Sequence, residues 1–174
     1  MNVEKWDILD EYGHKTGRTT FRGSVNLKPG EYHLVVHIWV LSSKGEFLLQ
    51  RRSDTKRLMP GEWAATGGAA IAGEDSFTAA RRELFEELGI TADSIDFMKL
   101  CRFKRRNSLL DAWVITYDTD ISDLSLQKSE VAEVKWVKRD DFLEMIKSGQ
   151  FHNYGNEYFE TLFEEIDNYR GAFV

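Results

Sequence analysis

Three glutamates, Glu83, Glu86 and Glu87, stand close together in a segment whose apolar residues have helical spacing. In an α-helix, residues three and four positions apart share a face, so Glu83 is predicted to lie beside both Glu86 and Glu87. Like charges at this spacing destabilise a helix by about a few tenths of a kcal/mol per pair. A divalent cation would offset this repulsion, because Mg²⁺ takes carboxylate oxygens as ligands and shares them with substrate phosphates.

The residues before this helix are suited to the same site. Glu74 stands near the start of the helix, and Gly67 and Gly68 precede it. Glycine lets the backbone approach an ion or a phosphate closely, because it has no side chain. A solvated acidic face would also explain three glutamates on one helix, so the choice depends on the wider pattern.

The wider pattern resembles the Nudix box. That motif is glycine, five residues, glutamate, seven residues, and then Arg-Glu-apolar-any-Glu-Glu-any-Gly-apolar. The stretch from Gly68 to Ile90, GAAIAGEDSFTAARRELFEELGI, matches it at every defining position. The chain therefore resembles Nudix hydrolases. The resemblance implies an α/β/α sandwich with a mixed sheet, and attack of water on a diphosphate linked to another group, with Mg²⁺ or Mn²⁺ as the cofactor.

The resemblance also implies roles for single residues. Arg82 is expected to orient the glutamates by ion pairing, and Glu74 to support either the loop and helix geometry or the metal. The residues that the resemblance places at the metal are Glu83, Glu86, Glu87, the Gly67 carbonyl and Glu74. These expectations come from the family and not from the spacing alone.

The proton of the attacking water needs an acceptor. Within the box, Glu83 or Glu86 could accept it, but in many relatives the base comes from a separate loop. Here the segment QKSEVAEVKWV offers Glu130 and Glu133. We favour Glu130, because Glu133 falls inside a predicted strand beside Val134. An ordinary loop carboxylate is the alternative reading of Glu130.

Basic residues before the box are suited to phosphate oxygens, which guanidinium groups bind by forked hydrogen bonds. The residues predicted to contact the substrate are Arg51, Arg52, Lys56 and Trp63. Neighbouring strand residues face opposite ways, so at least one of Arg51 and Arg52 should point towards the substrate. A solvated strand end is the alternative. A second basic cluster, residues 104–106, is predicted to be an exposed loop.

Two other functions compete with hydrolysis. The segment from Glu46 to Glu74 also resembles isopentenyl-diphosphate isomerases, which carry Cys-Gly-His where this chain has Gly67, Gly68 and Ala69. His33 matches a second metal histidine of that branch, but Asn26 stands seven residues earlier. A non-catalytic nucleotide-sensing or nucleotide-binding module is the second alternative, although such modules have lost box glutamates and this chain retains them all.

The elements that must position these residues follow from periodicity and turn residues. Residues 1–30 are predicted to form an N-terminal β-hairpin extension, and residues 31–174 the catalytic domain. Apolar runs at 33–41 and 46–53 predict a second hairpin. Further predicted strands cover 109–118 and 131–137, and the predicted helices are 76–88, with Ser76 or Asp75 as cap and Gly89 as its end, 139–149 and 156–170.

The net charge, the cysteine count and the N-terminal sequence bear on the partners and the location of the protein. The chain has 174 residues and a net charge of −6, which argues against nucleic acid as a partner. It has one cysteine and no signal-peptide pattern, so we expect a cytoplasmic protein that does not enter a membrane. The expected partner is a small-molecule diphosphate. The aromatic C-terminal helix would suit either a homodimer or the packing of a monomer.

Overall fold

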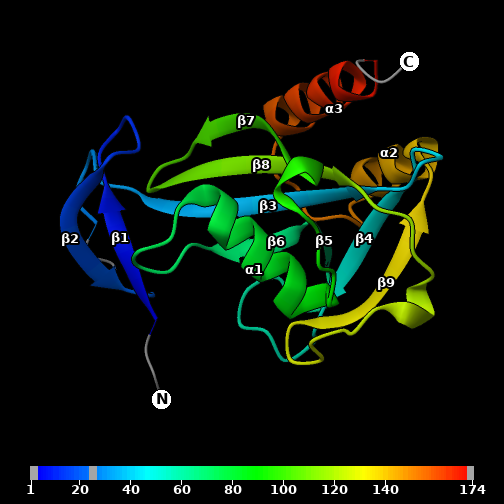
Figure 1. Cartoon of the computed structure of the whole chain (residues 1–174), viewed down its shortest axis with the longest axis horizontal. Helices are drawn as coiled ribbons and strands as arrows, with labels where there is room; N and C mark the ends of the chain where they lie inside the picture. Colours follow the sequence, from blue (N-terminus) through cyan, green and yellow to red (C-terminus); the bar gives the residue numbers. More distant parts are fainter. Residues whose placement is uncertain (1–3, 24–26, 172–174) are drawn as a thin grey trace.

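The helix that carries the glutamates packs on a mixed β-sheet (Figure 1). The computed structural model describes residues 4–23 and 27–171. The strands are β1 (Lys5–Leu9), β2 (Lys15–Phe21), β3 (His33–Leu41), β4 (Phe47–Arg52), β5 (Trp63–Ala64), β6 (Thr66–Ala69), β7 (Met98–Lys104), β8 (Ser108–Thr116) and β9 (Val131–Val137). The α-helices are α1 (Ser76–Leu88), α2 (Arg139–Lys147) and α3 (Asn156–Gly171), with 3₁₀ turns at Ser94–Asp96 and Ile121–Asp123.

Strand β3 is the centre of the seven-stranded sheet, whose main order is β5-β4-β3-β8-β7. It runs parallel to β8 and antiparallel to β4 and β6, while β9 joins β4 on the same sheet. The predicted pairing of β3 with β4 is confirmed, with Val40 opposite Leu48. Strand β7 has no counterpart among the predicted elements and pairs with β8 at the edge of the sheet.

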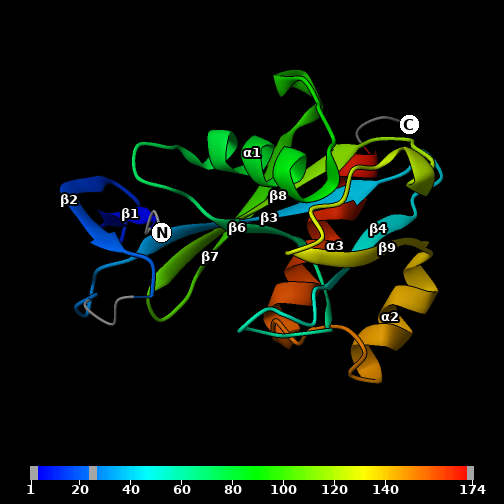
Figure 2. The same ribbon diagram turned by 90° about the horizontal axis from the view of Figure 1, so that it is seen from below.

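The sheet is covered on both faces, which confirms the predicted α/β/α sandwich. Figure 2 shows α1 on one side of the sheet and α2 and α3 on the other. Successive residues of a strand point to opposite faces. In β3, Val36 and Ile38 therefore pack in the core under α1, whereas Trp39 and Leu41 pack in the core under α2 and α3.

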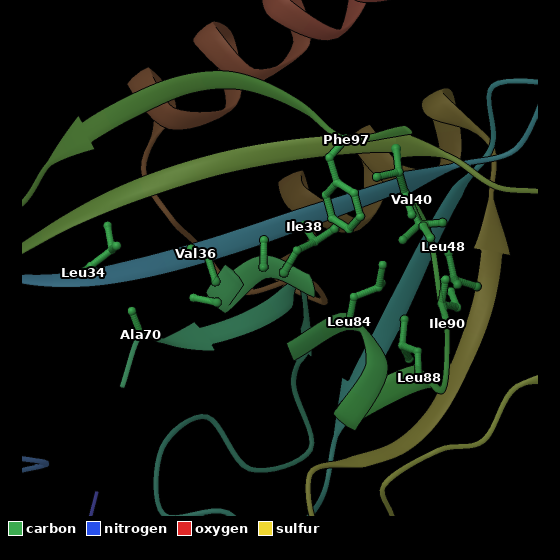
Figure 3. Packing of buried hydrophobic residues seen from close by; sticks show 14 of the residues in the cluster. Leu34, Val36, Ile38, Val40, Leu48, Ala70, Leu84, Leu88, Ile90 and Phe97 are labelled. Carbon is green, nitrogen blue, oxygen red and sulfur yellow. The ribbon is translucent and has the colours of Figure 1, made fainter. Parts of the chain in front are cut away.

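Helix α1 is held by the apolar stripe that its sequence predicts (Figure 3). Ala80, Leu84 and Leu88 are fully buried against the sheet. Asp75 caps the first turn, since its side chain accepts a hydrogen bond from the backbone N–H of Thr78 at 2.7 Å. Gly89 ends the helix in the left-handed conformation, with φ of 72°. Glu87 is buried beside this stripe, Glu83 is partly buried, and Glu86 is exposed.

Strands β1 and β2 pair with each other as a separate antiparallel sheet, at the left of Figure 1. Two contacts tie them to the loop that precedes α1. The backbone N–H of Ala72 donates to the Lys5 carbonyl, and the backbone N–H of Gly73 donates to the Asp7 carboxylate at 2.8 Å. The hairpin is therefore fixed next to the box.

A buried charge lies between the sheet and the start of α1. Asp111 of β8 has 0% of its surface exposed. Its carboxylate accepts two hydrogen bonds from Arg102, at 2.6 and 2.8 Å, and pairs with Lys99 at 2.7 Å. Both cations come from β7, so this cluster joins the edge strand to its neighbour.

No helix within the described residues is long and apolar enough to cross a membrane.

Candidate active site

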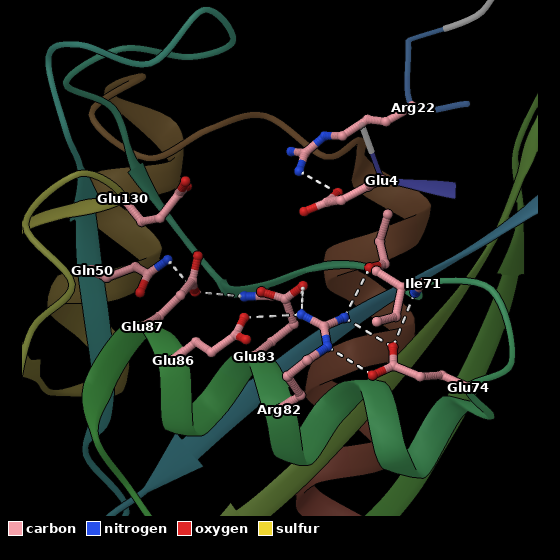
Figure 4. A network of polar contacts seen from close by, with 12 residues as sticks. Glu4, Arg22, Gln50, Ile71, Glu74, Arg82, Glu83, Glu86, Glu87 and Glu130 are labelled. Carbon is pink, nitrogen blue, oxygen red and sulfur yellow. Dashed lines mark hydrogen bonds and ion pairs between the residues drawn. The ribbon is translucent and has the colours of Figure 1, made fainter. Parts of the chain in front are cut away.

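The three glutamates of α1 form a row along the side of the helix (Figure 4). Glu87 is buried, with 3% of its surface exposed, and Glu83 is largely buried. The Glu86 side chain is 46% exposed. This gradient of burial arises because Glu87 faces the sheet between β4 and β6, while Glu86 faces outward.

Glu87 is held by two donors from the sheet. Its Oε2 accepts hydrogen bonds from the Gln50 side chain at 3.0 Å and from the backbone N–H of Gly67 at 3.1 Å. Burial, together with the negative charge of Glu83, raises the pKa of Glu87 to about 8 in spite of these two bonds. Burial also raises the pKa of Glu83. At Glu83 the effect of burial on the pKa exceeds the opposing effect of the Arg82 charge.

Arg82 holds the start of this row in place. Its Nε and Nη2 donate to the two oxygens of Glu74 at 2.7 and 2.9 Å, a forked ion pair. Its Nη1 donates to Glu83 at 2.9 Å and to Glu86 at 3.0 Å. Glu74 also accepts a bond from the backbone N–H of Ile71 at 3.0 Å, so it fixes the turn before α1. Glu74 therefore positions Arg82, and Arg82 positions Glu83 and Glu86.

A side chain at either of the two glycines before the helix would clash, but with different atoms. At Gly67, where φ is 149°, a Cβ atom would lie 2.0 Å from the Val36 carbonyl oxygen of the neighbouring strand. At Gly68 a Cβ atom would lie 2.4 Å from the Glu83 Oε1. Gly67 thus lets β6 pair with β3, and Gly68 makes room for a carboxylate of the row.

Replacing Gly68 with alanine is expected to displace the Glu83 carboxylate without unfolding the protein, because the clash involves the end of a flexible side chain. A shift of a catalytic group by about 1 Å can lower the rate by about 10²-fold. We expect a loss of that order in kcat/KM with a nearly unchanged Tm. Gly171→Ala is the matched control, because a Cβ atom there meets nothing within 4 Å. Equal kinetics for the two variants would contradict the placement of Glu83.

The glutamates of α1 line a cavity of about 360 Å³. Of the residues predicted from the sequence, those that line it are Arg52, Lys56, Gly67, Arg82, Glu83, Glu86, Glu87 and Glu130. Glu74, Arg51 and Trp63 are not among its lining residues. Arg51 turns to Glu133, to which its Nε donates at 2.6 Å, and Trp63 packs under the ammonium of Lys135.

The two loop carboxylates thus lie in different places. Glu130 directly precedes β9, lines the cavity and pairs with Lys56. Glu133 lies within β9 and pairs with Arg51 outside the cavity. Asn26, which bears on the comparison with isomerases, lies outside the described residues.

Several residues of the cavity were not predicted. Glu4, Trp6 and Arg22 come from the N-terminal hairpin, and Glu4 pairs with Arg22 at 2.7 Å. Residues 104–106 were expected to be an exposed loop, and this is only partly correct. Lys104 ends β7, and Arg105 is half-buried and lines the cavity.

The carboxylate oxygens of the α1 glutamates suit a hard cation as ligands, but their present arrangement does not surround a single ion position. Within the described ranges, no group of three or more His, Cys, Asp or Glu side chains is arranged to hold a metal ion. The reason is visible at Arg82, whose Nη1 already binds both Glu83 and Glu86. Carboxylate oxygens are the ligands that Mg²⁺ prefers. The residues present therefore fit the ion by chemistry, and Glu83 and Glu86 would have to leave Arg82 to bind it.

Comparison with known proteins identifies the family. The family model that describes the NUDIX domain matches residues 31–156 of this chain. The chain belongs to the NUDIX domain family. It is 39% identical over 153 residues to an uncharacterised Nudix hydrolase of Listeria monocytogenes, covering 87% of this chain and 90% of that protein. It is 34% identical over 156 residues to Nudix hydrolase 3 of Arabidopsis thaliana, covering 82% of this chain and 20% of that protein.

Solved structures share the fold of this Nudix protein. The crystal structure of DR0079 from Deinococcus radiodurans superposes with a TM-score of 0.75 at 22% identity, covering 91% of this chain and 97% of that one. The family match and the relatives named as Nudix hydrolases, with the complete box, identify this chain as a Nudix hydrolase.

Proposed function

We propose that this Nudix protein is a divalent-metal-dependent hydrolase that cleaves a diphosphate linkage in a nucleoside diphosphate joined to a further group, or in a related organic pyrophosphate. One observation carries the proposal. The complete row of box glutamates lies on the wall of a cavity that also contains basic side chains. A diphosphate needs such cations to offset the charge of the carboxylates.

We assign metal binding, phosphate binding and proton acceptance to different residues of the cavity. Glu83, Glu86, Glu87 and the Gly67 carbonyl would hold Mg²⁺ or Mn²⁺, which when bound polarises the phosphoryl oxygens and activates water. Arg52 and Lys56 would bind non-bridging phosphate oxygens, because both line the cavity. Glu130 would accept the proton of the attacking water.

The isomerase alternative is less well supported. That reaction moves protons to and from carbon and needs the cysteine and histidine that this chain replaces with Gly67 and Ala69. Cys101, the sole cysteine, is not among the lining residues of the cavity. It packs against the core under α2 and α3, and burial raises the pKa of its thiol to about 11. Such a thiol is mostly protonated at neutral pH and is a poor nucleophile.

A substrate panel tests the proposed function. The protein is incubated with Mg²⁺ or Mn²⁺ and with nucleoside triphosphates, nucleotide sugars including ADP-ribose, dinucleoside polyphosphates and isopentenyl diphosphate. Metal-dependent release of phosphate, pyrophosphate or a nucleoside monophosphate is expected with at least one nucleotide or organic pyrophosphate. Conversion of isopentenyl diphosphate to dimethylallyl diphosphate would establish an isomerase instead. Ligand-induced thermal shifts without turnover would establish a binding module.

The assignment of Glu130 is tested by a pair of glutamine variants. A general base contributes about 10²- to 10⁴-fold to the rate, so Glu130→Gln is expected to lower kcat by at least about 10²-fold. Glu133→Gln, which removes the carboxylate three residues away and outside the cavity, is expected to stay within about twofold of the wild type. Equal kcat values for the two variants would move the role of base to Glu83 or Glu86.

A further inference from the structure

Five arginine and lysine side chains line the cavity, namely Arg22, Arg52, Lys56, Arg82 and Arg105. Three of them are paired with carboxylates: Arg22 with Glu4, Lys56 with Glu130, and Arg82 with the glutamates of the box. For Arg52 and Arg105, by contrast, no carboxylate of the described residues lies within ion-pair distance. The positive charges of Arg52 and Arg105 are therefore available to an anion that enters the cavity.

Arg105 is held in place by aromatic rings. It lies in the turn between β7 and β8, and its guanidinium carbon is 5.7 Å from the centre of the Tyr154 ring and 5.9 Å from that of Tyr158. A guanidinium over ring faces is attracted by their π electrons and keeps its N–H donors free in its own plane. This arrangement orders the Arg105 side chain without using its hydrogen-bonding capacity.

Arg52 lines the same cavity from the end of β4. Its Nε donates to the Leu58 carbonyl at 3.1 Å, which orients the side chain and leaves both Nη groups available. Burial raises the pKa of the Tyr154 hydroxyl to about 12, and the charges of Arg105 and Arg52 both act against that rise. Arg52, Arg105 and Tyr154 all line the cavity, and the Tyr154 hydroxyl accepts a hydrogen bond from the backbone N–H of Ala65 at 3.2 Å.

His37 adds a further polar side chain to this part of the cavity. Trp39 donates to the Tyr158 hydroxyl at 3.1 Å, and that hydroxyl lies 2.8 Å from Nδ1 of His37. Either His37 Nδ1 or the Tyr158 hydroxyl can be the donor of this bond, according to the tautomer of the ring. His37 lines the cavity, so a ring N–H directed into it would be a donor for an anion.

We propose that Arg105, together with Arg52 and His37, forms an anion subsite that binds one phosphate group of the substrate while the other faces the glutamates of α1. The inference rests on the proposed function and narrows its substrate class to compounds whose diphosphate spans the cavity from α1 to the anion subsite. Arg105 would contact phosphate oxygens directly, and so it would determine specificity for a second phosphate.

The test measures binding without turnover. The full chain is titrated calorimetrically with methylenediphosphonate, a diphosphate analogue that cannot be hydrolysed, with and without Mg²⁺. Arg105→Ala is expected to weaken the Kd at least about tenfold, since it removes charge-assisted hydrogen bonds. Arg105→Lys, which keeps the charge but loses the fork, is expected to fall in between. The control is Arg106→Ala, because Arg106 is exposed, adjacent and not among the lining residues. It should stay within about twofold of the wild type.

Three results would overturn the subsite: no binding by the wild type, equal binding by the wild type and Arg105→Ala, or equal losses for the two alanine variants. If Arg105→Ala does not fold, as judged by its Tm, Arg105→Lys decides by the same comparison with Arg106→Ala. Weakened binding by the Arg105 variants, in a protein that hydrolyses nothing in the substrate panel, would uphold the subsite while the proposed hydrolase function fails.

Discussion

Replacing Glu86 with glutamine is expected to lower kcat/KM by about 10²- to 10³-fold in a protein that stays folded. Charge stabilisation by a bound metal is worth several kcal/mol in the transition state, and each 1.36 kcal/mol is about tenfold in rate. The fold should tolerate the change, because the Glu86 side chain is 46% exposed and makes one bond, to Arg82. Steady-state kinetics with the best substrate of the panel give the measurement.

The control for this variant is Glu160→Gln. Glu160 is an exposed glutamate of α3, on the opposite face of the sheet from the glutamate row. Its replacement changes the same charge and should leave kcat/KM within about twofold of the wild type. Matching kinetics for Glu86→Gln and the wild type would remove Glu86 from the metal site.

Replacing Asp111 with alanine is expected to destabilise the protein by about 3 kcal/mol. Breaking a buried ion pair by removing one partner typically costs about 3–5 kcal/mol. The value should fall at the lower end, because Arg102 and Lys99 have side chains 34% and 37% exposed and can be hydrated once released. Urea unfolding followed by circular dichroism would measure the change in the free energy of unfolding.

The same aspartate should make stability depend on acid pH. Burial raises the pKa of Asp111, but the bonds from Arg102 and Lys99 outweigh burial, and its folded pKa lies below the ordinary value. A lowered folded pKa gives a stabilising contribution that is complete above the unfolded pKa of about 3.9 and is lost as the pH falls towards the folded pKa. The destabilisation caused by Asp111→Ala should therefore shrink below about pH 4.

An exposed ion pair provides the comparison. Asp167 pairs with Arg139 through two hydrogen bonds, but the Asp167 side chain is 55% exposed. Exposed pairs contribute about 0–1 kcal/mol, so Asp167→Ala should change the unfolding free energy by no more than that. An equal effect of the two substitutions would show that burial of Asp111 is not what makes its pair important.

Local signals were sufficient for the elements that carry the glutamates. Helix α1 has its apolar stripe, its cap at Asp75 and its stop at Gly89 within one short segment, so sequence alone predicts its bounds. The β3–β4 hairpin is equally local. Strand β7 was missed because it is an edge strand whose residues are exposed or half-buried, with no fully buried position. Alternation between apolar and polar residues, the usual sign of a strand, is interrupted at Cys101, where the pairing with β8 shifts register.

The composition of the cavity could be predicted only in part. The box shows which residues gather on α1. No local signal connects Arg105 to Tyr154, or places Glu4 in the same cavity as Glu83, because these residues belong to distant segments. Gln50 did have a signal. It is a polar residue at the end of the apolar run of β4, and burial of such a residue requires partners, which are Glu87 and the Ala65 carbonyl.

The most direct test of the central claim is a crystal structure of the protein with Mn²⁺ and methylenediphosphonate, with anomalous diffraction used to locate the metal. We expect manganese bound to carboxylate oxygens of Glu83, Glu86 and Glu87, in contact with the diphosphonate, and Glu83 and Glu86 released from Arg82. Diphosphonate in the cavity with manganese absent from these carboxylates, or bound elsewhere, would contradict a metal-dependent hydrolase built on α1.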